Sequence, residues 1–268
     1  MGSADTDRMY MCIDLKSFYA SVECADLGVD PFTTPLVVAD NSRGKGAITL
    51  AISPALKKLG VKNRSRLFQI PSHIEYITVK PHMKRYMQAS AQIYGTLLNY
   101  ISPEDIHVYS IDEYFIDITP YTNLYKKTPR QLAQLLLDAV LDATHIYATV
   151  GIGTNLFLAK IALDILAKHA LDFIGYLDEN LFKEQIWYHQ PITDIWQIGS
   201  GIANRLRKFG AFDLHGITQV PEHKLYKEFG VNAELLIDHA WGRESCTIAD
   251  IHAYRPSKHS LSQSQILL

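Results

Sequence analysis

Three acidic side chains, Asp14, Asp112 and Glu113, have the types and settings needed to bind divalent metal ions. Asp14 follows an apolar run at residues 10–13, and the adjacent pair lies between two apolar, β-branched runs. Magnesium prefers oxygen ligands on a rigid support, and two such ions about 4 Å apart promote in-line attack on phosphorus. The three residues therefore predict a two-metal carboxylate site for nucleotidyl transfer.

An adjacent acidic pair carries little weight by itself, since 28 acidic residues among 268 should produce about three such pairs by chance. The sequence contains three: Glu104-Asp105, Asp112-Glu113 and Asp178-Glu179. Only the second lies between apolar strands, where uncompensated charge costs folding free energy. A bound cation is the natural compensation, so the setting of the pair is what indicates a metal site.

Strand and helix signals around the acids predict how they are held. Residues 10–13 read as a strand and 17–25 as a helix, so Asp14 is expected at a strand-to-helix junction. Residues 106–111 and 114–118 read as the two strands of a hairpin that carries Asp112 and Glu113 at its bend. All three acids can then meet at one edge of a sheet.

The helices that should cover this sheet have recognisable ends. Residues 82–100 form a long amphipathic segment, and Thr128 with Gln131 predicts a capping box that begins a helix ending near Thr144. Residues 147–152 read as a strand, and Thr154 is expected to cap a helix from Asn155 to about Lys168. The order predicts an α+β fold, a ferredoxin-like antiparallel sheet with helices on one face.

Composition excludes several classes of protein. No run of eighteen apolar residues predicts a membrane span, and three widely spaced cysteines indicate reduced thiols, so we expect a cytoplasmic protein. The scattered histidines lack the paired spacing of a zinc site. Charge is nearly balanced, with 26 basic and 28 acidic residues, but residues 41–66 contain seven basic residues and no acidic one. That stretch is either a solvated face or a surface for phosphates.

Three segments resemble, in order and spacing, the signatures of Y-family (UmuC/DinB-type) translesion DNA polymerases. They are residues 13–23 (IDLKSFYASVE), 109–118 (YSIDEYFIDI) and 149–155 (TVGIGTN), the last leading into 158–162 (LAKIA). The resemblance extends over nearly the whole chain, from Tyr10 to about Ile266. It is greatest to the bacterial branch that includes the catalytic subunit of polymerase V.

The resemblance implies that Asp14, Asp112 and Glu113 are catalytic and hold two Mg²⁺ ions. The backbone carbonyl of Leu15 would be a further ligand. The chemistry implied is transfer of a nucleotide from a dNTP to a primer 3′-hydroxyl.

Nucleotide contacts are implied at Phe18, Tyr19, Lys57 and Lys160. Phe18 and Tyr19 would lie under the incoming sugar, and an aromatic ring at the Tyr19 position is the family's steric gate, which leaves no room for a ribose 2′-hydroxyl. Lys160 would reach the triphosphate. Taken alone, an aromatic ring at the Tyr19 position is typical of ordinary helix packing, and a lone lysine on a helix surface is usually just solvated.

The resemblance also implies a domain plan of a ferredoxin-like palm, an inserted small fingers domain and an all-α thumb with a helix-hairpin-helix. The palm is expected at residues 1–20 and 81–176, the fingers at 21–80 and the thumb at 177–250. Residues 251–268 would be a tether and the beginning of a truncated fourth domain, the little finger. Without that domain we expect weak DNA binding and poor processivity.

One segment of the fingers departs from the family pattern. Where the family commonly has Tyr-x-x-Arg, this chain has Pro54 and Lys57. Proline has no hydrogen-bonding side chain, and lysine is a point charge rather than a planar fork, so phosphate contacts here must be made differently.

In the thumb, residues 198–202 (IGSGI) and the helix-forming run 203–210 resemble the family's helix-hairpin-helix. Gly199 and Gly201 would let backbone amides approach a DNA phosphate without reading sequence. A tight turn between helices with no ligand is an equally good interpretation.

These features together favour a low-fidelity, template-directed DNA polymerase without proofreading that acts in DNA damage tolerance of the SOS type. Its partners would be primer-template DNA and dNTPs, with a sliding clamp or SOS accessory proteins as further candidates, and no membrane. Two alternatives stay open. One is a catalytically inactive, DNA-binding regulatory relative, and the other is a nucleotidyl cyclase, which also uses acids on a ferredoxin-like sheet.

Overall fold

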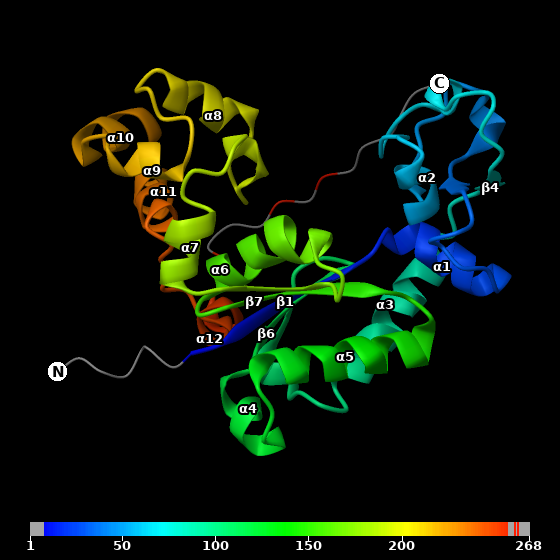
Figure 1. Cartoon of the computed structure of the whole chain (residues 1–268), viewed down its shortest axis with the longest axis horizontal. Helices are drawn as coiled ribbons and strands as arrows, with labels where there is room; N and C mark the ends of the chain where they lie inside the picture. The colour runs from blue at the N-terminus through cyan, green and yellow to red at the C-terminus, as the bar shows by residue number, and fades with distance from the viewer. Residues whose placement is uncertain (1–7, 257–259, 261, 263–268) are drawn as a thin grey trace.

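The computed structural model describes residues 8–256, 260 and 262, and its largest sheet has five strands in the order β5-β6-β1-β7-β8 (Figure 1). The strands are β1 (Tyr10–Leu15), β5 (Ile106–Val108), β6 (Glu113–Asp117), β7 (Ala148–Gly153) and β8 (Ile174–Leu177). Central β1 is antiparallel to both β6 and β7, whereas β8 pairs with β7 in parallel. The first four strands have the ferredoxin-like order, which confirms the predicted fold class; β8 was not predicted.

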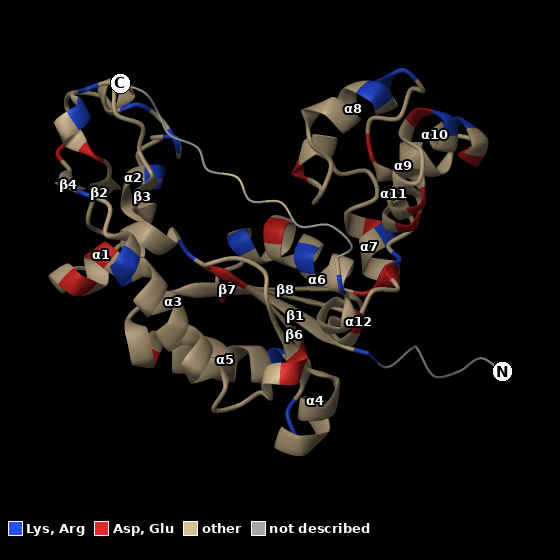
Figure 2. Cartoon of the chain, turned by 180° about the vertical axis from the view of Figure 1, so that it is seen from behind, with Lys and Arg blue, Asp and Glu red and all other residues tan. Residues whose placement is uncertain are grey.

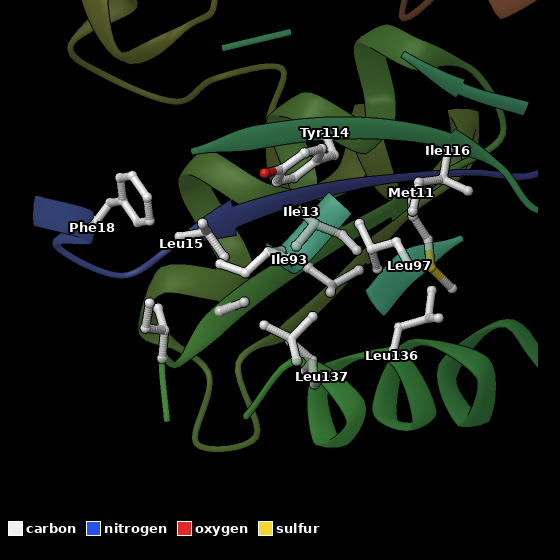
Figure 3. Packing of buried hydrophobic residues seen from close by; sticks show 14 of the residues in the cluster. Met11, Ile13, Leu15, Phe18, Ile93, Leu97, Tyr114, Ile116, Leu136 and Leu137 are labelled. Carbon is white, nitrogen blue, oxygen red and sulfur yellow. The ribbon is translucent and has the colours of Figure 1, made fainter. Parts of the chain in front are cut away.

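Successive side chains of β1 point to opposite faces of the sheet, so β1 contributes to two separate layers of the core. Met11, Ile13 and Leu15 pack with the helices α3 (Met83–Leu97) and α5 (Pro129–Thr144), as Figure 3 shows for part of this cluster. Tyr10 and Cys12 pack on the opposite face. There the neighbours come from α6 (Leu156–Ile161) and α12 (Ile248–Ala253), so the expectation that helices cover a single face was wrong.

The start of α5 confirms the capping box read from the sequence. The Thr128 hydroxyl accepts from the Gln131 amide at 3.2 Å, and the Gln131 side chain accepts from the Thr128 amide at 3.0 Å. The two bonds satisfy donors that a helix leaves unpaired at its first turn.

The segment after β7 differs from the single helix predicted for residues 155–168. Asn155, not Thr154, is the cap, and its side-chain oxygen accepts from the Leu158 amide at 2.8 Å. The chain then runs through α6, a π-helical turn η4 (Ala162–Leu166) and a 3-10 turn η5 (Ala167–His169). The wider turn changes which side chains share a face of this segment.

Two glycines of β7 let this segment lie directly on the sheet. A Cβ atom at Gly151 would lie 2.1 Å from the carbonyl oxygen of Ala159, and one at Gly153 would lie 2.2 Å from the amide nitrogen of Ala159. Both neighbours are backbone atoms, so no side-chain rotation relieves the overlap. Glycine at these positions is therefore required by the close approach of α6.

We expect Gly153→Ala to lower the free energy of unfolding by about 1–3 kcal/mol, because α6 must move off the sheet. Urea denaturation measures the change. Gly95→Ala, at an exposed position in α3 with no heavy atom within 4 Å of the added carbon, is the control and should raise stability by about 0.5–1 kcal/mol. Equal effects of the two substitutions would contradict the packing argument.

Two smaller parts rise on either side of the large sheet (Figure 1). One contains α1 (Phe18–Leu27), α2 (Pro54–Lys58) and a second sheet in the order β3-β2-β4, made of β2 (Leu36–Val38), β3 (Ala51–Ile52) and β4 (Ile77–Val79). The other is helical and contains α7 (Glu179–Gln185), η6 (Ile192–Asp194), α8 (Ser200–Arg207), α9 (Leu214–Thr218), α10 (Glu222–Phe229) and α11 (Asn232–Ala240). We use fingers and thumb for these two parts and palm for the large sheet with its helices.

The predicted domain limits stay predictions, but two observations bear on them. The second sheet lies within residues 21–80, and its Leu36 and Val38 join the palm core through α1. The expected tether at 251–268 overlaps the end of α12 and otherwise falls largely outside the described residues. Within the described part, no helix combines the length and apolar character needed to cross a membrane. All three cysteines are unpaired.

Candidate active site

Strand pairing brings the three predicted acids to one edge of the palm sheet. Asp14 lies directly opposite Glu113 in the β1–β6 register. The Leu15 amide donates to the carbonyl oxygen of Asp112 at 3.0 Å, which ties the hairpin turn to β1. Glu113 is the first residue of β6 rather than part of the bend, so only Asp112 lies in the turn.

The Asp14 and Glu113 side chains share the face covered by α6. Residues paired across antiparallel strands point to the same side, and Cys12, two positions from Asp14, lies on that face. The Cys12 thiol donates to Glu113 Oε1 at 3.4 Å. Asp112 is held differently, because its Oδ1 accepts from the Ser110 hydroxyl at 2.8 Å.

Two lysines of the segment after β7 compensate this negative charge. Lys160 Nζ pairs with the Glu113 carboxylate and lies 3.0 Å from Asp164 Oδ2. Lys168 Nζ lies 2.7 Å from Asp164 Oδ1 and 3.8 Å from Asp14 Oδ2. Asp164 therefore joins two lysines that each face a different predicted metal ligand.

Sequence reasoning missed Asp164 and Lys168. Their signal was the spacing of four residues from Lys160 to Asp164 to Lys168, a basic-acidic-basic series on one helical segment. Such a series is common on solvated helices, and only the neighbouring acids distinguish it here.

Burial and like charge perturb this cluster. Burial raises the pKa of Asp14 to about 6; Lys168 opposes the change, and Asp112 and Glu113 add to it. Burial disfavours the charge of Lys160, yet Cys12, Asp164 and Glu113 together raise its pKa above the usual value. Burial thus disfavours the charged form of Asp14 in the absence of a further cation, a condition that favours cation binding.

Because the folded-state pKa of Asp14 lies above the unfolded value, this carboxyl stabilises the metal-free fold below about pH 4, and the stabilisation is lost as pH rises through about 6. The difference in free energy of unfolding between Asp14→Asn and wild type should therefore shift in favour of the variant by about 2 kcal/mol when the pH is raised from about 4.5 to about 7.5. Urea unfolding in a chelator at both pH values measures the difference. Asp142 is an exposed residue of α5, and for Asp142→Asn the corresponding shift should be less than about 0.5 kcal/mol. A shift as large as that of Asp14→Asn would contradict the assignment of the pH dependence to Asp14.

The donor set fits magnesium in chemistry but is not gathered into a ligand cluster. The acids offer only oxygen atoms, as Mg²⁺ requires. Among the described residues, no group of three or more His, Cys, Asp or Glu side chains is arranged to hold a metal ion. Glu113 is turned to Lys160 and Asp112 to Ser110, so these contacts would have to change for a cation to bind. The role predicted for the Leu15 carbonyl stays a prediction.

The two predicted sugar contacts occupy different environments. Tyr19 is half-buried, its ring lies 4.6 Å from that of Tyr86, and burial followed by the charge of Asp112 raises its pKa. Phe18 is 3% exposed and belongs to the palm core, beside Leu15 (Figure 3). Tyr19 is therefore the ring with surface available to a ligand near the acids.

Basic residues mark the fingers around α2 and the thumb helix α8 (Figure 2). In the fingers, the pKa of Lys57 is lowered by desolvation and by Lys168, while Asp14 acts in the opposite direction, so Lys57 lies within electrostatic reach of the acids. In the thumb, Gly199 precedes α8 and Gly201 lies in its first turn, both exposed and with open space at the Cβ position. The element before this turn is the single 3-10 turn η6 rather than a full helix.

The architecture matches solved structures of Y-family DNA polymerases. A Y-family polymerase chimera of Dbh and Dpo4 matches with a TM-score of 0.75 and 26% identity over 90% of this chain and 69% of its own. A structure described as a Dbh ternary complex matches with a TM-score of 0.73 and 26% identity over 89% of this chain and 68% of its own. The palm, fingers and thumb are thus the arrangement of a Y-family polymerase core.

The sequence gives the same result. The family model described as impB/mucB/samB matches residues 13–164, more than half of the chain, and the chain belongs to this family. The putative UV-damage repair protein UvrX of Bacillus subtilis (strain 168) is 33% identical over 96% of this chain, and DNA polymerase IV 2 of the same organism is 33% identical over 86%. The chain spans 60% and 55% of the length of these two relatives.

Proposed function

We propose that this chain is the catalytic core of a template-directed DNA polymerase that transfers nucleotides from dNTPs to a primer 3′-hydroxyl. The observation that carries the proposal is the pairing of Asp14 with Glu113 beside Asp112, at the end of the palm sheet where β1 leads into α1 of the fingers (Figure 1). Relatives named DNA polymerase IV and a structure described as a ternary complex support it.

In this proposal Asp14, Asp112 and Glu113 hold two Mg²⁺ ions, which supply activation of the attacking hydroxyl and stabilisation of the leaving pyrophosphate. Lys160, Lys168 and Lys57 then place positive charge on the α6 and fingers sides of the acids, where a triphosphate carries its negative charge. Tyr19 borders the same edge and limits the space beside the sugar. The palm sheet fixes the relative positions of these groups.

Replacing Asp112 tests the chemistry. Asp112→Ala should reduce Mg²⁺-dependent primer extension by at least about a thousand-fold, because the reacting phosphate loses charge stabilisation that other residues cannot supply. Extension is followed on a DNA template with labelled primer. The matched control is Asp142→Ala on α5, which should extend like wild type. Extension retained by the Asp112 variant would refute the assignment.

Tyr19 is expected to exclude ribonucleotides. Tyr19→Ala should reduce the preference for dNTP over rNTP by about ten-fold or more, since the removed ring opens space for a 2′-hydroxyl. Tyr19→Phe retains the ring and should keep the preference of wild type. The measurement is kcat/KM for single-nucleotide addition with each substrate. An unchanged preference in the alanine variant would place the gate elsewhere.

The wider role follows from the same relatives. We propose low-fidelity synthesis past damaged template without proofreading, in a damage response of the SOS type, because one relative is named a UV-damage repair protein. Primer-template DNA and dNTPs are the proposed partners, a sliding clamp or SOS accessory proteins are further ones, and the cytoplasm is the proposed location. Failure of the wild-type chain to extend any primer while still binding DNA would favour the inactive regulatory relative instead. Formation of a cyclic nucleotide would favour the cyclase.

A further inference from the structure

Phe173 has a backbone conformation that phenylalanine rarely adopts. Its φ is 61°, in the left-handed region that favours glycine. The conformation reverses the chain between η5 and β8: the Phe173 amide donates to the Ala170 carbonyl at 3.2 Å, and its carbonyl accepts from the Val150 amide at 2.9 Å. Glycine would make this turn without strain. A bulky side chain at a strained position therefore indicates that the ring itself contributes something.

The ring joins the palm to the fingers. It stacks on Phe32 of the loop between α1 and β2, with ring centroids 6.2 Å apart and planes 12° apart. Phe32 also meets Tyr147, the residue before β7, edge to face, with ring centroids 4.9 Å apart. Lys16 lies over the Phe173 ring at 4.4 Å, and Lys58 lies over Phe32 at 5.6 Å. We call Phe32, Phe173, Tyr147, Lys16 and Lys58 the aromatic clamp.

The clamp is connected to the candidate site on both its palm side and its fingers side. Lys16 is two residues beyond Asp14, and its amide donates to the Tyr147 carbonyl at 2.8 Å. On the fingers side, the Ala55 amide donates to the Pro31 carbonyl at 3.0 Å, and the Ser53 hydroxyl donates to the Thr34 carbonyl at 2.8 Å. The loop that carries Phe32 is thus bonded to the beginning of α2, the helix that presents Lys57.

Beside the clamp, the same loop borders a cavity that it shares with the palm. Its volume is about 450 Å³, and its lining includes residues 28–31 of the loop, Leu141 of α5, His145 and Tyr147. Stacking on Phe173 is a direct side-chain contact that joins the loop, and through it α2, to the palm.

We propose that Phe173 is a positioning residue for nucleotide binding: by stacking on Phe32 it holds the fingers loop and α2 so that Lys57 faces the candidate site. The proposal rests on the polymerase function proposed above. It assigns a role to a residue outside the three signature segments and to a backbone strain that the turn alone does not require.

The test uses Phe173→Gly in the full chain, a change that removes the ring and also relieves the strained backbone. We expect hydrogen exchange in residues 28–58 of the free protein to become about three- to ten-fold faster, with exchange in α5 unchanged. In primer extension the KM for dNTP should rise by a similar factor, with kcat within about two-fold. Phe173→Tyr keeps the ring and should behave as wild type in both measurements.

Two further variants complete the design. Phe32→Leu should reproduce both effects, and combining it with Phe173→Gly should add little, because both remove one contact. Phe68→Leu, which alters a 60% exposed phenylalanine of the fingers, is the control and should change neither measurement. Unchanged exchange in residues 28–58 of the Phe173→Gly variant would overturn the proposal. Exchange is measured without substrate, so this outcome is distinct from a failure of the proposed polymerase activity, which Asp112→Ala tests separately.

Discussion

The structure around the site depends on one electrostatic constraint, the placement of two carboxylates opposite each other on neighbouring strands. Like charges at paired positions of a sheet repel, and here both are largely removed from solvent. Lys160 and Lys168 offset the repulsion, and Asp164 holds the two lysines together. Those lysines reach the sheet only because α6 lies against β7, and that approach requires glycine in the strand. Local charge, helix position and strand composition are thus one coupled arrangement.

Much of the palm could be predicted from the sequence, because its signals are local. The capping residues of α5, the apolar run that forms β1 and the hairpin of β5 and β6 all follow from short-range rules, and each is present. The errors arose where a long-range contact decides the outcome. Thr154 and Asn155 are both good caps by type, and only the fold selects Asn155. The short β8 is defined by its parallel pairing with β7, which no local pattern reveals.

The candidate site also combines features that local sequence predicts with features that only long-range contacts determine. The three acids could be found from residue type, setting and a family resemblance, and the structure brings them to one edge. Their partners could not, because Lys168 lies eight residues beyond Lys160 and looks like a solvated lysine in the sequence. Nor could the isolated motif indicate that Phe18 is buried while its neighbour Tyr19 keeps exposed surface, since that difference is set by packing against α3 and the palm core.

The π-helical turn η4 has a geometric consequence for this cluster. In a regular α-helix, residues eight positions apart are displaced by about 80° around the axis, so two such side chains diverge. A wider turn between them rotates the chain less per residue and brings positions 160, 164 and 168 back toward a common line. The π-helical turn therefore places lysines eight positions apart on one side of a short segment, where they can face carboxylates on two adjacent strands.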